Sequence, residues 1–161
     1  VAPPPKVKTV HISMERGTIE LPELRGRIID VCRTDALQEC TSSSPAYAGN
    51  ILPGPNALSV PAGTYRLKFG NVYVEGVDVK AGQPTVVKTG VISIPDFRDI
   101  VVPVCQENAT GECNSRSTGY VGDIISGPNF LVVPPGTYKI QFPNQLIENI
   151  TVEPGQTVEL E

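Results

Sequence analysis

An internal duplication constrains the fold of this chain more than any other feature. Residues Gly17 to Gln83 align with Gly90 to Gln156 without a gap, and the second copy keeps the cysteines, turn residues and strand alternation of the first. Self-similarity at a fixed period indicates repeated structural units and outweighs the single domain that 161 residues would suggest. We therefore predict two small domains, residues 17–89 and 90–161, after a Pro-rich linker and edge strand in residues 1–16.

Each copy carries its own pair of cysteines, Cys32 with Cys40 and Cys105 with Cys113, and each pair encloses seven residues. One local disulfide per copy is the economical interpretation, because a unit of roughly 70 residues buries a small core and benefits from a covalent staple. A shared zinc site is the rival, but structural zinc sites favour cysteines two to four residues apart. Free thiols are the third possibility. Disulfides would imply an oxidising compartment.

Alternating apolar and polar residues over 64–69 and 137–142 predict strands with one buried and one wet face. A Pro- and Gly-containing turn precedes each strand, and no window shows a helical period over ten residues. We predict an all-β protein, a tandem of small immunoglobulin-like or prealbumin-like β-sandwiches. Pro103 interrupts the β-branched stretch 101–105 and predicts an edge strand or a bulge there.

Residues 84–94 run from one copy into the next without a Gly/Ser-rich or Pro-rich spacer. A flexible hinge is therefore not expected. We predict a stiff rod or a packed, pseudo-symmetric pair.

The segments 60–83 and 133–156 resemble the bacterial PEGA-like and carboxypeptidase-regulatory-like modules in the last third of each copy. The resemblance lies in Val60-Pro61-Ala62-Gly63-Thr64-Tyr65 and its partner, followed by a second short alternation and a Gly-Gln turn. It implies a prealbumin-like β-sandwich that spaces, anchors or binds within an exported protein. Ala-Gly-Thr replaces the acidic motif of the first family, and no functional residue carries over.

Charge and hydropathy exclude two classes of partner. The net charge is −4 with Lys and Arg scattered singly, which argues against nucleic-acid binding. No apolar stretch approaches the ~20 residues that a membrane-spanning helix needs. With the cysteines, the Pro-rich start of the chain predicts an extracytoplasmic protein in the periplasm, at the cell surface or secreted.

Two loop pairs are the candidate binding residues. Tyr47 and Asn56 in the first copy match Tyr120 and Asn129 in the second, and a tyrosine beside amide or carboxylate groups suits sugar binding. A role in turns and core edges is the alternative interpretation. Arg25 and Arg98 each lie two positions after an acidic residue. Each arginine could bind an anionic partner, or it could form a solvated ion pair with that acid.

Catalysis is not predicted. His11 is the single histidine, and no nucleophile or acid is marked out near it. A calcium site from Asp30, Asp35 and Glu39 is conceivable, but its acids are mostly absent from the second copy, so we predict no metal and no cofactor.

The leading hypothesis is a non-catalytic structural or interaction module of an exported bacterial surface or periplasmic protein. It would act by contact with a protein partner, or with other domains of its parent protein, or as a rigid spacer. The alternative is a carbohydrate-binding module that uses the Tyr47 and Tyr120 loops.

Overall fold

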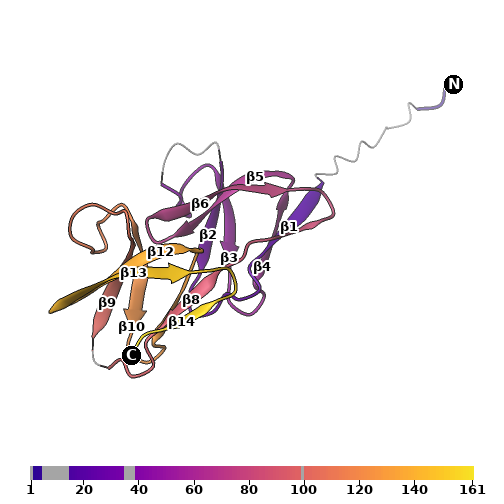
Figure 1. Ribbon diagram of the computed structural model, residues 1–161. Coiled ribbons are helices and arrows are strands. Elements are labelled where there is room, and N and C mark those ends of the chain that lie inside the picture. The colour runs from indigo at the N-terminus through magenta and orange to yellow at the C-terminus, as the bar shows by residue number, and fades with distance from the viewer. Residues whose placement is uncertain (1, 5–14, 35–38, 99) are drawn as a thin grey trace.

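The computed structural model describes residues 2–4, 15–34, 39–98 and 100–161, and all its regular structure is β. The edge strand predicted around His11, and Asp35 of the conceivable calcium site, lie outside the described residues. Figure 1 shows two adjoining β bodies, and within the described residues each holds seven strands. The predicted all-β tandem of sandwich-like modules is confirmed.

The first module holds β1 (Arg16–Glu20), β2 (Ile29–Arg33), β3 (Tyr47–Ile51), β4 (Ala57–Pro61), β5 (Gly63–Phe69), β6 (Val72–Val79) and β7 (Pro84–Val86). Its sheets have the orders β3-β2-β5-β6 and β4-β1-β7. All neighbours are antiparallel except β1 and β7, which run parallel.

The second module repeats this arrangement with β8 (Gly90–Ser93), β9 (Val101–Gln106), β10 (Tyr120–Ile125), β11 (Phe130–Val133), β12 (Gly136–Phe142), β13 (Gln145–Val152) and β14 (Thr157–Glu159). The sheet orders are β10-β9-β12-β13 and β11-β8-β14. The predicted boundary between residues 89 and 90 falls between β7 and β8.

The alternation predicted for 64–69 and 137–142 is seen in β5 and β12, where the apolar residues face the core. Tyr65, Leu67 and Phe69 are buried in the first module, and Tyr138 and Ile140 in the second. The two tyrosine hydroxyls donate to the carbonyl oxygens of Pro61 and Pro134, four residues upstream. Each hydroxyl thereby fixes the turn before its strand, as buried tyrosines do at the corners of other sandwiches.

Of the edge strand or bulge predicted at Pro103, the edge strand is wrong, because β9 lies between β10 and β12. A bulge lies close by, since the register of β10 against β9 shifts between Tyr120 and Gly122, opposite Cys105 and Val104. Strand β12 pairs with β9 only over Val104 to Gln106. Proline cannot donate a ladder hydrogen bond, and here it lies beyond the end of that pairing. The sheet therefore accommodates it without a free edge.

The two predicted disulfides are present, Cys32–Cys40 and Cys105–Cys113, with Cα atoms 5.8 and 5.9 Å apart. Both lie within single modules, and the described residues include no free cysteine. In the chain-entropy model a loop of this size is worth about 2.5 kcal/mol to a module.

Candidate functional site

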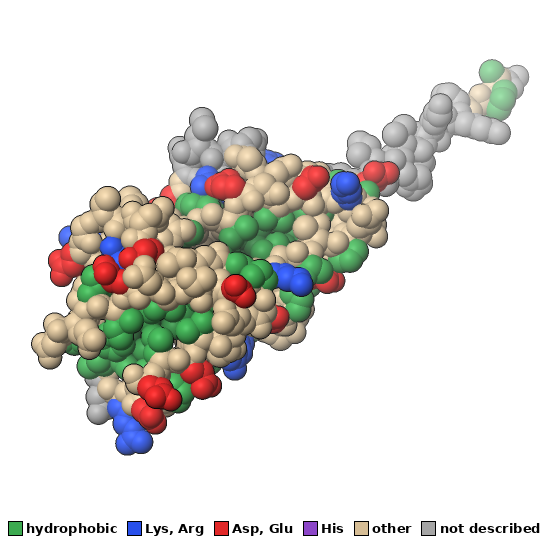
Figure 2. All heavy atoms as spheres, in the orientation of Figure 1, with side chains coloured by type: hydrophobic (Ala, Val, Ile, Leu, Met, Phe, Trp, Pro, Cys, Tyr) green, Lys and Arg blue, Asp and Glu red, His purple; other side chains and the backbone are tan. Residues whose placement is uncertain are grey.

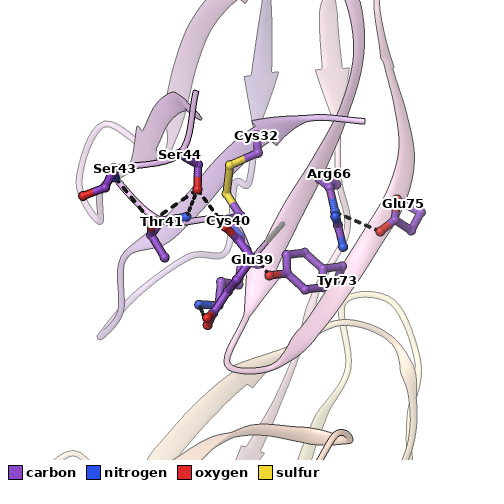
Figure 3. The surroundings of a disulfide bond; sticks show 10 residues. Cys32, Glu39, Cys40, Thr41, Ser43, Ser44, Arg66, Tyr73 and Glu75 are labelled. Carbon is purple, nitrogen blue, oxygen red and sulfur yellow. Dashed lines mark hydrogen bonds and ion pairs between the residues drawn. A yellow bond between two sulfur atoms is a disulfide. The ribbon is translucent and has the colours of Figure 1, made fainter. Parts of the chain in front are cut away.

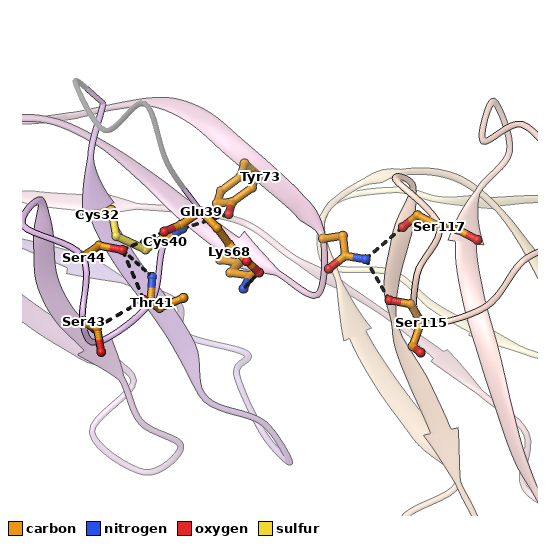
Figure 4. Close-up of polar contacts among 11 residues, drawn as sticks. Cys32, Glu39, Cys40, Thr41, Ser43, Ser44, Lys68, Tyr73, Ser115 and Ser117 are labelled. Carbon is orange, nitrogen blue, oxygen red and sulfur yellow. Dashed lines mark hydrogen bonds and ion pairs between the residues drawn. A yellow bond between two sulfur atoms is a disulfide. The ribbon is translucent and has the colours of Figure 1, made fainter.

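The modules meet where the tip of the β5–β6 hairpin reaches the β10 end of the second module. The backbone N–H of Asn71 donates to the Tyr120 carbonyl at 2.7 Å. The Asn71 side-chain amide donates to the carbonyl oxygens of Ser115 and Ser117, both at 2.9 Å (Figure 4). One asparagine thus satisfies three main-chain acceptors of the neighbouring module.

Gly70 allows this close approach. Its φ is +64°, and a Cβ atom added to it would lie 2.7 Å from the Tyr120 carbonyl oxygen and 2.8 Å from the Val121 carbonyl carbon. Real Cβ atoms do not come so near to backbone, and L side chains are disfavoured at this φ. The junction therefore requires glycine at this position.

Arg27 forms the second polar contact across the junction. Its guanidinium donates to the carbonyl oxygens of Val132 and Val121, each at 2.9 Å. The group also lies 5.3 Å from the ring centroid of Phe69. Burial lowers the pKa of Arg27 to about 10, against smaller opposing effects of Tyr120 and Tyr138, and the side chain stays charged at neutral pH.

The apolar cores also cross the junction. Val91 and Val132 of the second module pack into the core of the first, while Val72 of the first packs into the core of the second. Val132 is fully buried and Val72 is 8% exposed. Shared apolar burial opposes independent movement of the modules, because separation would expose these side chains to water.

The loops that follow the disulfides present the main-chain acceptors. In the second module the Ser117 hydroxyl donates to the Glu112 carbonyl at 2.6 Å and accepts from the Asn114 N–H at 3.0 Å. In the first module Ser44 makes the matching bonds to the Glu39 carbonyl and the Thr41 N–H, at 2.6 and 3.0 Å (Figure 3). The two loops therefore hold the same shape, although among the described residues only the second accepts hydrogen bonds from the neighbouring module.

The first loop is also tied to its own sheet. The Tyr73 hydroxyl accepts from the Cys40 N–H at 3.0 Å, and Lys68 forms an ion pair with Glu39 at 2.7 Å. The bond to Lys68 holds the pKa of Glu39 below its usual range. The pairing with Lys68 gives Glu39 a structural partner in place of the conceivable calcium ion. Among the described residues, no cluster of three or more His, Cys, Asp or Glu could hold a metal.

Tyr47 and Tyr120 begin β3 and β10 and are half-buried. Burial raises the pKa of Tyr47, and burial with a hydrogen bond to Asp123 raises the pKa of Tyr120 to about 12. The Tyr120 carbonyl accepts from the hairpin tip of the first module, whereas no hairpin tip in the described part of the chain bonds to its counterpart in Tyr47. The two tyrosines that the sequence presents as equivalent thus have different environments.

Asn56 and Asn129 have structural roles in their turns. Each has a positive φ, 54° and 63°, and each side-chain oxygen accepts from a glycine N–H two residues earlier, at 3.0 Å. Their amides donate to the carbonyls of Pro22 and Pro95, at 3.0 and 2.9 Å. These bonds hold each loop against the start of its module. They also occupy the side-chain oxygen and nitrogen atoms that would otherwise bind a ligand.

Arg25 and Arg98 are equivalent in the repeat, but like the two tyrosines they have different environments. The Arg25 guanidinium lies over the Phe130 ring of the second module, 4.2 Å from its centroid. Arg98 is exposed, in the segment between β8 and β9. Beside Arg25 a surface pocket of about 330 Å³ spans the junction, and its lining residues are Pro22, Glu23, Leu24, Arg25, Val91, Gly155, Gln156 and Thr157.

Several residues that build the junction were not singled out from the sequence. Arg27, Gly70 and Val72 align with Ile100, Pro143 and Gln145, so they are positions at which the copies differ. Residues shared by the two copies therefore do not reveal them. The usable signal was the departure from the repeat, a glycine and an arginine that only the first copy carries.

No protein-family model matches this chain, and neither the curated proteins nor the solved structures gave a match. Within the described residues, no helix is long and apolar enough to cross a membrane.

Proposed function

We propose that this protein is a non-catalytic structural and interaction element in which two β-sandwich modules are held as one rigid unit. The supporting observation is the junction, where polar contacts from Asn71 and Arg27 and shared core residues join the modules. A flexible tether would need none of these contacts. A fixed orientation is useful for spacing other domains or for presenting a composite surface to a protein partner.

The two disulfides indicate an oxidising, extracytoplasmic compartment. We extend this to a role in an exported protein, at the cell surface, in the periplasm or secreted. Figure 2 shows apolar side chains gathered over each module, with acidic and basic groups interspersed around them. Such a mixed surface suits contact with a protein better than contact with a uniformly charged polymer.

Backbone ¹⁵N relaxation tests the rigid unit. In the wild type we expect one rotational correlation time for both modules. Replacing Arg27 and Asn71 together by alanine removes their four side-chain hydrogen bonds across the junction but leaves the bond from the backbone N–H of residue 71 and the shared apolar contacts. The correlation times of the two modules should therefore separate and shorten. Two independent correlation times in the wild type would contradict the proposal.

Sugar binding by the tyrosine loops is the second candidate. It is favoured by the half-buried tyrosine rings, whose hydroxyls bond to polar neighbours, Asn50 for Tyr47 and Asp123 for Tyr120. Reproducible glycan-array binding that is lost in a folded Tyr47→Ala, Tyr120→Ala double variant would rank this function first.

A further inference from the structure

The first module carries a copy of the surface on which its own hairpin docks in the second module. We call Ser115, Ser117, Tyr120, Val121, Gly122 and Val132 the second acceptor surface. Its counterpart, the first acceptor surface, consists of Ser42, Ser44, Tyr47, Ala48, Gly49 and Ser59. Four of the six positions are identical in the two surfaces: the two serines of the loop, the tyrosine and the glycine.

The first acceptor surface already has the shape that its counterpart uses. Ser44 and Ser117 hold their loops by the same two hydrogen bonds, and the N–H groups of Tyr47 and Tyr120 donate to the carbonyls of these serines at 3.0 and 3.1 Å. Binding would therefore require little rearrangement, which lowers its cost.

The two surfaces differ in what covers them. Val121, Gly122 and Val132 are buried, the last by the core of the first module. Their equivalents Ala48 and Gly49 are half-buried, and Ser59 is exposed. Within the described chain, no hairpin covers the first surface as β5–β6 covers the second.

Arg16 of this chain partly takes the place of the missing neighbour. Its guanidinium donates to the Ser59 carbonyl at 2.7 Å and to the Ser59 hydroxyl at 3.1 Å. The Ser59 carbonyl is the equivalent of the Val132 carbonyl, to which Arg27 donates across the junction. An arginine therefore approaches this carbonyl in both modules, from within the module in one and from the neighbour in the other.

We propose that the first acceptor surface is a docking site for the β-hairpin tip of a further module of this kind. The tip it fits has the sequence Phe-Gly-Asn-Val, as in residues 69–72, with an arginine equivalent to Arg27 alongside. The Asn side chain and N–H would donate to the carbonyls of Ser42, Ser44 and Tyr47. This site extends the proposed interaction role by naming the partner, and it does not depend on how rigid the tandem is.

A second wild-type copy does not supply such a tip in free form, because its own residues 69–72 are docked on its own second module and its other hairpin differs. The β12–β13 hairpin has Pro143 where Gly70 stands, and the Gly70 position has no room for even a Cβ atom. Ile100 replaces Arg27, and Gln145 replaces Val72. The partner is therefore a module with the glycine tip, and the wild-type chain is expected to be monomeric by this route.

Grafting the missing tip provides the probe. The unlabelled triple variant Ile100→Arg, Pro143→Gly, Gln145→Val carries the Phe-Gly-Asn-Val tip on its second module. It is titrated into ¹⁵N-labelled wild-type protein, whose fold is not altered. We expect chemical-shift changes centred on Ser42, Ser44, Tyr47, Gly49 and Ser59, with no such changes when unlabelled wild type is added.

Two receptor variants sharpen the test. Ser59→Glu places a carboxylate where Val132 is buried in the second module, and it should weaken binding at least about tenfold. Arg16→Thr, which installs the residue of the second copy, should strengthen binding by freeing the Ser59 carbonyl. Thermal melts would verify that both variants are folded.

Absence of shifts at the first acceptor surface at millimolar probe, or binding that Ser59→Glu leaves unchanged, would overturn the proposal. If the triple variant does not fold, the Pro143→Gly single variant replaces it, with the Arg16→Thr protein as receptor, and the same outcomes decide. Relaxation of the wild type alone reports rigidity, so failure of docking and failure of the rigid unit remain distinguishable.

Discussion

The hairpin between β5 and β6 ends in Phe-Gly-Asn-Val at residues 69–72, and the hairpin between β12 and β13 ends in Phe-Pro-Asn-Gln at 142–145. In the first, Phe69 is fully buried and Asn71 bonds to three carbonyls of the next module. In the second, residues 143–145 are exposed. Two substitutions separate a tip that joins modules from one that faces solvent, so the duplication kept the modules and changed the connection between them.

Of the variants that compare the two hairpin tips, Gly70→Ala should change the stability of the protein most. We expect a loss of about 3 kcal/mol in the free energy of unfolding, because the added Cβ meets the Tyr120 and Val121 backbone and the positive φ is disfavoured. Gly76→Ala is the matched control, since its φ of +69° is similar and no atom lies within 4 Å of its Cβ position. It should cost about 1 kcal/mol. Equal losses in urea denaturation would mean that close approach at the junction contributes nothing.

Removing one disulfide at a time distinguishes the occupied acceptor surface from the open one. Cys32→Ser with Cys40→Ser, and Cys105→Ser with Cys113→Ser, should each cost about 2.5 kcal/mol in the free energy of unfolding. The second pair should also shift the NMR signals of the Asn71 side-chain amide, because its acceptors Ser115 and Ser117 follow Cys113. An Asn71 amide signal that does not change would show that the disulfide does not position these acceptors.

Asn71→Ala and Asn144→Ala compare the same residue in the two tips. Loss of the two side-chain hydrogen bonds of Asn71 should destabilise the protein by about 1–2 kcal/mol in chemical denaturation. Asn144 is exposed, and its replacement should stay within about 0.5 kcal/mol of wild type. A comparable loss in both variants would place the role of the asparagine in the turn itself.

Alkaline pH should give the smallest effect. The pKa of Tyr120 is raised to about 12, and burial raises that of Tyr138 still further. Such groups stay protonated to a higher pH in the folded state than in the unfolded state. Their contribution to the free energy of unfolding is therefore complete below pH 10 and is lost as pH rises from 10 toward 12. Arg27, with its lowered pKa, acts in the opposite direction. Unfolding free energies at pH 8, 10 and 11 should therefore fall, and less steeply in Tyr138→Phe.

Much of the fold could be predicted from the sequence because its determinants are local. Alternation defined β5 and β12, and the cysteine spacing defined the disulfides, since each pair closes a short loop within one module. The interior position of β9 could not be read from Pro103, because it depends on where β12 stops pairing. Asn56 and Asn129 fitted a binding site by composition, whereas in the fold their side chains bond within the turns and to the carbonyls of Pro22 and Pro95.

By itself the sequence determined a twice-repeated, all-β architecture with one disulfide in each module, because turn chemistry, side-chain alternation and short loop closure act over a few residues. Only the tertiary structure decided that Gly70, Asn71 and Arg27 join the modules, and that the first module presents an uncovered copy of the same acceptor surface. Those contacts link residues 44 to 105 positions apart along the chain, from Asn71 with Ser115 to Arg27 with Val132. The acceptors of these hydrogen bonds are backbone carbonyls. Every residue has one, so the residue types do not show which carbonyl will be used.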